Sequence, residues 1–239
     1  MTTTSDPARP GELDAAMEAL ARLDLGTQSL SATLQRVAEL AKRALPEVDE
    51  TSITLLRGER AHTAVFTSPI AVRLDERQYE SGFGPCLDCA ATGATIVLRH
   101  TDPDPVYPAF TREALRAGIR HTVSVALLVP HRSAGALNLY AADTEISVDT
   151  VLAAERFAAY AAVAVANADR LDQAQELAAQ MHQAMQSRAV IEQAKGILMA
   201  RHGYDPDRAF AELARRSQHK NVKLRDLAAR MVADPRRAG

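Results

Sequence analysis

Two cysteines stand three residues apart near the middle of the chain, in the run Gly-Pro-Cys-Leu-Asp-Cys. Cys86 and Cys89 would lie about one helical turn apart, which is close enough for a strained and reducible disulfide. Pro85 is typical of the first turn of a helix, where the pKa of a thiol is lowered. The pair could therefore sense redox state. The alternative, which we favour, is a pair of structural thiols.

Other residues that could do chemistry do not form a recognisable centre. A zinc site would need two further ligands, and the sequence offers neither a second C-x-x-C nor a spaced histidine pair, so we expect no metal. His100 and His121 have ordinary loop or strand roles as their simplest explanation. Asp102 and Asp104 could hold a cation, but the prolines beside them indicate turn chemistry. No phosphate-binding glycine loop and no G-x-S-x-G elbow is present, which argues against an enzyme.

The C-terminal segment differs from the rest of the chain in its charge. Residues 187–239 contain 12 Lys or Arg and 6 Asp or Glu, a balance of +6, whereas the remaining residues contain 16 and 24, a balance of −8. A basic segment on an acidic chain suggests a polyanionic partner. The alternative is a solvated basic face on a protein-interaction module.

Several residues of this segment have side chains suited to a nucleic acid. Lys195 is a mobile cation that could contact a phosphate. Gly196 lies inside a predicted helix, where it costs about 1 kcal/mol relative to Ala, so either a partner or a neighbouring helix must approach closely. Arg216, Ser217 and Asn221 gather around one turn and could bind exposed loop bases. Helix capping is an equally good explanation for Asn221.

Three short helices are predicted to position these residues. The first ends at Gly203, and the second begins with Asp205 as its N-cap and Pro206 in its first turn. Asn221 is predicted to cap the third. The expected buried stripes are Ile191, Ala194 and Leu198; then Ala209, Phe210, Leu213 and Ala214; then Leu224, Leu227, Ala228 and Met231.

This segment resembles an ANTAR domain, the RNA-binding module of bacterial transcription antiterminators. The matching residues are the run Ala194 to Met199, then Ala209, Phe210, Leu213, Arg216, Ser217, Asn221, Lys223, Leu224, Asp226 and Ala228. The resemblance implies that RNA stem-loops in nascent transcripts are the partner. The expected contact residues are Lys195, Gly196, Met199, Arg216, Ser217, Asn221 and Lys223. The alternative is a protein- or DNA-binding regulator, although the third helix is poor in side chains that could read bases.

The elements before this segment predict an α+β domain with an antiparallel sheet flanked by helices. Helices are expected over 11–25, 30–45, 74–80 and 110–117, with a further short helix opened by Pro85. Strands are expected over 51–57, 61–67, 95–98, 121–130 and 136–140, with turns over 58–60 and 131–135.

This order resembles a GAF domain. The matching residues are the runs Gly82 to Cys86, Tyr107 to Phe110, Gly118 to Arg120 and Gly135 to Tyr140. The resemblance implies a sensory domain with a small-molecule effector rather than a bound cofactor, and a pocket covered by Phe83, Cys86, Tyr107 and Phe110. An enzyme on this scaffold is a further alternative, because free-methionine sulfoxide reductases share the fold. Together, the two resemblances suggest a GAF–ANTAR regulator of the actinobacterial type.

An uninterrupted helical pattern begins near Asp149 and is expected to reach about Gln186. Its apolar residues recur at alternating steps of three and four, which predicts a seam between two helices, as in a coiled coil. We expect a homodimer through Leu171, Ala178, Met181 and Met185; the alternative is one helix packed along its own domain. The predicted organisation is a disordered segment 1–10, a GAF-like domain 11–167, a linker 168–186 and an ANTAR domain 187–239.

The chain has no run of 18 apolar residues, and its N-terminus lacks the basic and apolar regions of a signal peptide. We therefore expect a cytoplasmic protein that does not enter a membrane.

Overall fold

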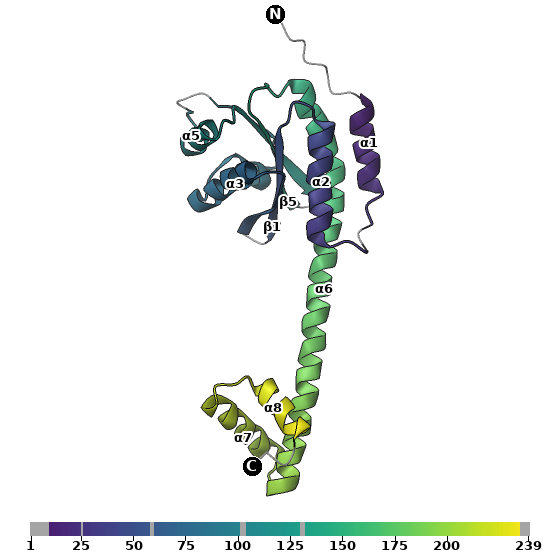
Figure 1. The fold of residues 1–239 in the computed structure, drawn as a ribbon, viewed down its shortest axis with the longest axis vertical. Coiled ribbons are helices and arrows are strands. Elements are labelled where there is room, and N and C mark those ends of the chain that lie inside the picture. Colours follow the sequence, from purple (N-terminus) through teal and green to yellow (C-terminus); the bar gives the residue numbers. More distant parts are fainter. Residues whose placement is uncertain (1–9, 25, 58–59, 101–103, 130–131, 235–239) are drawn as a thin grey trace, which may run out of the picture. The chain divides into compact units, whose positions relative to one another are not determined.

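The computed structural model describes residues 10–24, 26–57, 60–100, 104–129 and 132–234 (Figure 1). Asp102, the predicted turn at 58–59 and the predicted disordered residues 1–9 lie outside these ranges. The chain divides into two compact units, Met1–Asp172 and Gln173–Gly239. One long helix, α6 (Val148–His202), contributes residues to both units, and each unit is described separately below.

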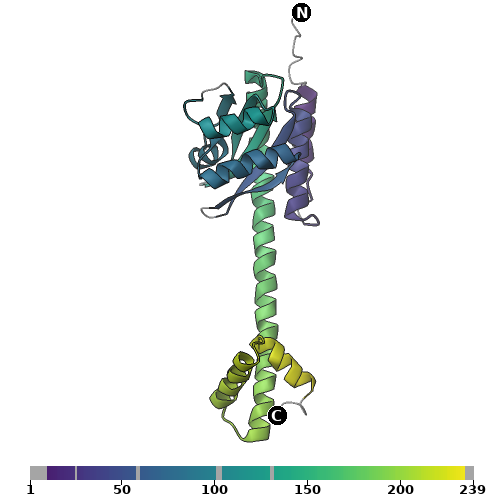
Figure 2. The ribbon, with the colours of Figure 1, turned by 60° about the vertical axis from the view of Figure 1, so that its left-hand side comes forward.

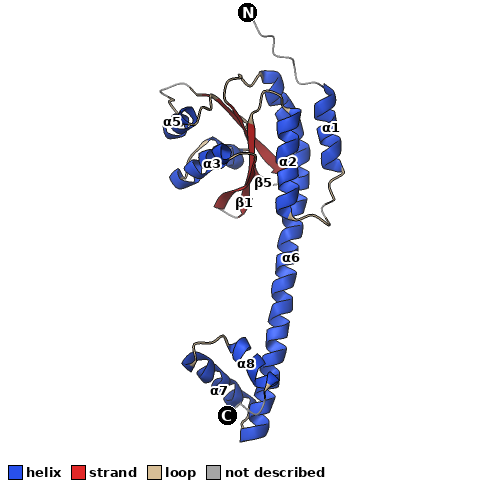
Figure 3. Cartoon of the chain, in the orientation of Figure 1, coloured by secondary structure: helices blue, strands red, loops and turns tan. Residues whose placement is uncertain are grey.

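The first unit is built on a five-stranded antiparallel sheet, as predicted (Figure 3). The strands are β1 (Glu50–Arg57), β2 (Arg60–Phe66), β3 (Ile96–Arg99), β4 (His121–Val129) and β5 (Arg132–Ala141), in the order β2-β1-β5-β4-β3. β5 begins earlier than the predicted 136–140 and contains Gly135 in its paired region. A Cβ atom at Gly135 would lie 1.8 Å from the Thr54 carbonyl oxygen, so only glycine fits between β1 and β4 there.

One face of the sheet carries the apolar core. Side chains alternate between the faces of a strand, so Val123, Val125, Leu137 and Leu139 point to the same side. The helix α2 (Leu30–Ala44) and the first half of α6 cover this face, and α1 (Pro10–Ala21) packs against α2 on the side away from the sheet. Phe157 on α6 is fully buried here, which confirms that the early part of the long helix packs on its own sheet.

The helices α3 (Pro69–Ser81), α4 (Pro85–Thr92) and α5 (Pro108–Arg116) cover the opposite face; Figure 2 brings this layer forward. The predicted helix over 74–80 was too short, because Ser68 caps the helix through the Ala71 amide and Pro69 occupies its first turn. α4 and α5 begin with Pro85 and Pro108 in the same way.

The second unit contains the end of α6, α7 (Pro206–His219) and α8 (Leu224–Ala233). The first of the three predicted short helices is wrong as a separate element: it is the last part of α6, which continues past Gln186 to His202. Gly203 has a positive φ of 66° and ends the helix, and Asp205 caps α7 through the Arg208 amide, as predicted. The buried core of this unit is Ala194, Leu198, Ala209, Leu213, Leu227, Ala228 and Met231.

Candidate functional sites

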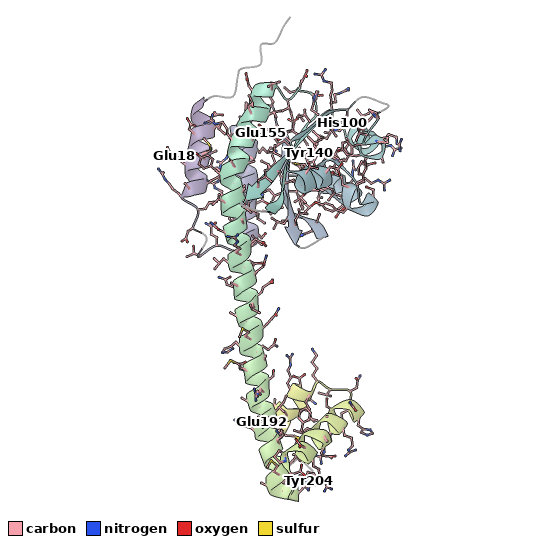
Figure 4. The ribbon with its side chains drawn as sticks, turned by 180° about the vertical axis from the view of Figure 1, so that it is seen from behind. Glu18, His100, Tyr140, Glu155, Glu192 and Tyr204 are labelled. Atoms are coloured by element: carbon pink, nitrogen blue, oxygen red, sulfur yellow. The ribbon has the colours of Figure 1, made fainter. Side chains whose placement is uncertain are left out.

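Lys195 lies on the α6 part of the second unit and is less mobile than the sequence suggests. Its side chain is only 16% exposed, and its Nζ atom lies 3.0 Å from Oε2 of Glu192, one helical turn earlier (Figure 4 labels Glu192). Met199 follows Lys195 by one turn and packs partly against the core. Lys195 can contact a phosphate only in competition with its own carboxylate partner.

Gly196 is exposed, and a Cβ atom built on it would meet nothing within 4 Å among the described residues. Close packing of a neighbouring helix within the unit therefore does not explain the glycine. The approach of a partner at Gly196 stays a prediction.

The turn between α7 and α8 gathers the other predicted contact residues. Asn221 has a left-handed φ of 50°. Its backbone N–H donates to the Gln218 carbonyl, and the backbone N–H of Val222 donates to the Ser217 carbonyl. This pattern ends α7, so the prediction that Asn221 caps α8 is wrong: Lys223 occupies that position. The Ser217 hydroxyl donates to the Val222 carbonyl at 2.5 Å and braces the turn.

The side chains of this turn differ in their availability. Arg216 is half-buried and pairs with Glu212 at 2.6 Å, whereas Asn221 and Lys223 are exposed. The turn geometry uses only the backbone of Asn221, and no residue in the described part of the chain bonds its side-chain amide. Glu212 also pairs with Arg215, and the two guanidinium groups lower the pKa of the Glu212 carboxyl to about 2.

Phe210 departs from its predicted place in the core. Its side chain is 46% exposed, although its neighbours Ala209 and Leu213 are fully buried. The buried face of α7 is narrower than the sequence pattern suggests, because a short helix in a three-helix unit needs only one stripe to face its two partners.

In the first unit, three of the four predicted pocket residues line a cavity of about 260 Å³ between α3 and α5. Phe83, Tyr107 and Phe110 form its aromatic wall, and the rings of Phe83 and Tyr107 lie 5.1 Å apart. Cys86 does not line this cavity, because its side chain is fully buried between α4, to which it belongs, and the sheet. Six further residues line the cavity and were not among the predicted pocket residues: Arg77, Gln78, Ser81, Val106, Pro108 and Ala109.

Cys86 and Cys89 are free, fully buried thiols. The Sγ atom of Cys89 lies 3.2 Å from the Ser124 carbonyl oxygen, and that of Cys86 lies 3.7 Å from the Thr54 hydroxyl. Burial raises the pKa of Cys86 and raises that of Cys89 to about 12. The expected lowering by a helix N-terminus is therefore wrong, since desolvation of the thiolate is the larger effect.

A buried polar network lies on the sheet face beneath α3, and its residues were not predicted. Asp75 accepts hydrogen bonds from the Tyr140 hydroxyl at 2.5 Å, the Thr63 hydroxyl at 3.0 Å and the Asn138 amide at 3.2 Å. Tyr79 bonds Thr63 at 3.0 Å. Burial raises the pKa of Asp75 to about 6. Alternate polar residues, Ser52 and Thr54 on β1 and Asn138 and Tyr140 on β5, could have indicated such a face.

His100 has a structural role in the first unit. His100 is buried and bonded to the hydroxyls of Thr111 and Thr122, and burial lowers its pKa to about 4, so it is neutral at pH 7 (Figure 4 labels it). Asp104 accepts bonds from the backbone amides of Val106 and Tyr107, as turn chemistry predicts. No group of three potential metal ligands occurs in the part of the chain that the structure describes.

The four residues expected at a dimer seam follow one another along α6. Leu171 is half-buried, Ala178 is exposed, and Met181 and Met185 are among the most exposed large apolar side chains. α6 is also long and apolar enough to span a membrane by length and composition alone, but half of its most apolar window is buried within the protein, as in a core helix.

The fold of the first unit is similar to that of several solved proteins. The transcription factor CepR2 from Burkholderia cenocepacia, described as N-acylhomoserine lactone dependent, matches with 20% identity and a TM-score of 0.51 over 69% of this chain and 96% of that one. The protein fRMsr of Staphylococcus aureus, in complex with substrate, matches with 15% identity and a TM-score of 0.52 over 69% and 99%. A GAF domain from a phosphoenolpyruvate-protein phosphotransferase of Coxiella burnetii matches with 14% identity and a TM-score of 0.51 over 67% and 94%. At these identities the likeness shows the fold alone.

A comparison with curated proteins gave no match. Two family descriptions do match the sequence: the GAF domain over residues 29–165 and the ANTAR domain over residues 179–232. Both are regulatory domains, and the first covers more than half of the chain. The chain therefore belongs to the GAF domain family and, with its C-terminal ANTAR domain, has the domain organisation of a GAF–ANTAR regulator.

Proposed function

We propose that this protein is an RNA-binding transcription antitermination regulator that binds stem-loops in nascent transcripts through its ANTAR domain. The observation that carries the proposal is that the ANTAR match, over residues 179–232, overlaps the basic segment 187–239, whose charge balance is +6 while the rest of the chain has −8. The positive charge of the segment and its domain type thus point to the same residues as the RNA-binding part.

The α7–α8 turn offers the chemistry that an RNA loop requires. Lys220 and Lys223 are exposed cations on either side of Asn221, whose exposed amide can both donate and accept. Lysines contact phosphates without reading sequence, whereas an amide can bind the edge of an unpaired base. Lys195 and the open surface at Gly196 would add a second set of contacts on α6.

We further propose that the protein acts as a homodimer through Leu171, Ala178, Met181 and Met185 of α6. The exposure of Met181 and Met185 supports this proposal, because two such side chains at a spacing of four fit a seam between helices. Joining two ANTAR domains would raise the effective concentration of the second domain for a pair of stem-loops.

The GAF domain is the proposed sensory part, with a small-molecule effector in the cavity bounded by Phe83, Tyr107 and Phe110. An apolar wall with a few polar groups at its edge is typical of ligand pockets. The buried, protonated thiols of Cys86 and Cys89 do not support a redox role or thiol catalysis.

Binding of a labelled stem-loop RNA, compared with duplex DNA of the same sequence, tests the proposal. We expect RNA to bind more tightly than DNA at every salt concentration, and the affinity to fall as salt rises because neutralised phosphates release counterions. Equal or tighter binding of duplex DNA would favour the DNA-binding alternative. Failure to bind either would favour a protein partner.

A further inference from the structure

Phe210 presents an aromatic side chain to solvent on the ANTAR domain. It is 46% exposed, although the neighbouring Ala209 and the other large apolar residue of α7, Leu213, are fully buried. Burying a phenylalanine stabilises a protein by about 1.5–3 kcal/mol, so α7 forgoes part of this contribution at one position. A single exposed apolar residue is common, and the surroundings of Phe210 must decide whether it has a role.

Ala214 and Ser217 follow Phe210 at intervals of four and three residues along α7, so the three share one side of the helix. This side leads into the turn that holds Asn221. Asp207, three residues before Phe210, is an exposed charged residue at the start of this side, and Lys220 and Lys223 stand exposed beside its other end. The order is an aromatic ring, a small residue and a hydroxyl over about 10 Å of helix, followed by the Asn221 side-chain amide in the turn, with cations at the margin.

The second aromatic residue of this unit is already engaged within the protein. The ring of Tyr204 stacks with that of His202 at 5.2 Å, and the guanidinium of Arg208 lies 4.5 Å from its centre. Within residues 173–239, Phe and Tyr occur only at 204 and 210. Of these two rings, that of Phe210 is the one available to a partner.

We propose that Phe210 is a stacking platform for an unpaired base of the RNA loop, next to the Ser217–Asn221 turn. The inference rests on the proposed RNA-binding function and deepens it by naming the target: a base that is splayed out of its loop. Aromatic rings combined with lysines are the usual means of binding single-stranded nucleic acid, because every base has a face that can stack. A protein partner would be expected to bury a broader apolar surface than one ring beside Ala214 and Ser217.

The chain contains no tryptophan, so Phe210→Trp introduces a single fluorophore at the proposed contact. Titration of the full-length variant with stem-loop RNA should quench its emission, with the same midpoint as the anisotropy change of the labelled RNA. The matched control is Phe66→Trp, at a 41%-exposed phenylalanine of β2 in the GAF domain, whose emission should not change. Quenching of both, or of neither, would overturn the stacking contact.

Two further substitutions separate stacking from folding. Phe210→Leu keeps an apolar side chain without a ring and should weaken RNA binding by about 10-fold, since one stacked base contributes about 1–3 kcal/mol. Phe210→Tyr keeps the ring and should bind within about twofold of wild type. If Phe210→Leu binds RNA as wild type does, the ring does not hold a base. If Phe210→Leu instead lowers the sedimenting mass, the ring does not hold a base either, and Phe210 lies at a contact between two copies of the chain.

The wild-type titration distinguishes the two levels of the proposal. If wild type binds no stem-loop RNA, the proposed function fails and the stacking contact fails with it. If wild type binds but the Phe210 variants behave as controls, only the stacking contact fails.

Discussion

Glu192 holds the Lys195 ammonium in a surface ion pair, and an incoming phosphate must displace it. Removing the carboxylate should therefore help RNA binding. Exposed pairs of this kind contribute about 0.2–1 kcal/mol, so we expect Glu192→Gln to tighten stem-loop binding by about two- to fivefold. Glu176→Gln is the control, because it removes an equal charge from another exposed site of α6. An equal gain in the two variants, measured by anisotropy, would mean that only overall charge matters.

The thiols of Cys86 and Cys89 are both buried and protonated, which has a direct consequence for their reactivity. A thiol with a pKa of about 12, as at Cys89, has almost no thiolate at pH 7. We expect both to react with a maleimide far more slowly in the native protein than in urea, with labelling followed by mass spectrometry. Rapid native labelling of either cysteine would restore the redox-sensor interpretation.

Asp75 should make the stability of the GAF domain depend on pH. Its pKa is about 6 in the folded protein and about 3.9 when unfolded, so the folded state holds the proton more tightly. The stabilisation is complete below pH 4 and is lost as the pH rises through 6, an effect on the order of 3 kcal/mol. His100 acts in the opposite direction, because its lowered folded pKa of about 4 makes stability fall as the pH falls. The two effects offset one another in the same range.

Replacing Asp75 should therefore leave the pH dependence of stability that His100 contributes, in which stability rises with pH. Relative to wild type, the free energy of unfolding of Asp75→Asn should rise by about 3 kcal/mol from pH 4 to 7, as measured by urea unfolding. Only this difference is used, since the amide also alters the bonds to Tyr140 and Thr63. Asp143→Asn, at an exposed site, should show no such rise. Parallel pH profiles for wild type and Asp75→Asn would contradict the raised pKa.

At the scale of elements, the α7–α8 turn combines a structural and a functional demand on one residue. Asn221 needs a left-handed backbone, which costs alanine about 1 kcal/mol more than glycine. Asn221→Gly should preserve the free energy of unfolding while removing the amide, and Asn221→Ala should lose both stability and the amide. We expect the two variants to discriminate equally poorly between RNA loop sequences. Unimpaired discrimination by Asn221→Gly would leave the residue with a turn role alone.

The elements differ in how far sequence patterns could predict them. The order of strands and helices in the GAF domain followed from apolar periodicity and from turn residues such as Gly118. α3 begins five residues before the predicted Leu74, because Ser68 and Pro69 form a capping signal that the apolar spacing from Leu74 onward does not contain. The separate first helix of the ANTAR domain was wrong because no glycine or proline stands between Gly135 and Gly196 to end α6.

The candidate sites were predicted less completely, for a physical reason. A residue's type reveals what it could do, but its partners come from distant parts of the chain. Burial raises the pKa of Asp75, and its hydrogen-bond partners Tyr140 and Thr63 lie 65 and 12 residues away. The exposure of Phe210 likewise depends on how three helices share a small core, which helical spacing alone does not determine.

At the scale of the whole molecule, the proposed dimer couples oligomeric state to RNA affinity. Replacing Leu171 and Met181 together by Asp would place like charges across the α6 seam and should yield a monomer by sedimentation. The monomer should bind one stem-loop nearly as wild type does but lack the gain of about 10-fold or more that we expect of wild type for a tandem pair. Glu176→Gln and wild type serve as dimeric references. A monomeric variant that binds the tandem RNA as tightly as wild type would disprove the coupling.

Crosslinking in cells, followed by sequencing of the bound RNA, tests the central claim most directly. The measurement uses the intact protein with its own effector and transcripts, so it does not depend on choosing a probe RNA. We predict recovery of a small set of transcripts, with crosslinks concentrated on paired stem-loops that overlap a terminator, and loss of this set with the Phe210→Leu and Asn221→Gly substitutions combined. Recovery of RNA without a shared stem-loop, or the same set from the double variant, would contradict the account of the ANTAR domain as a reader of RNA loops.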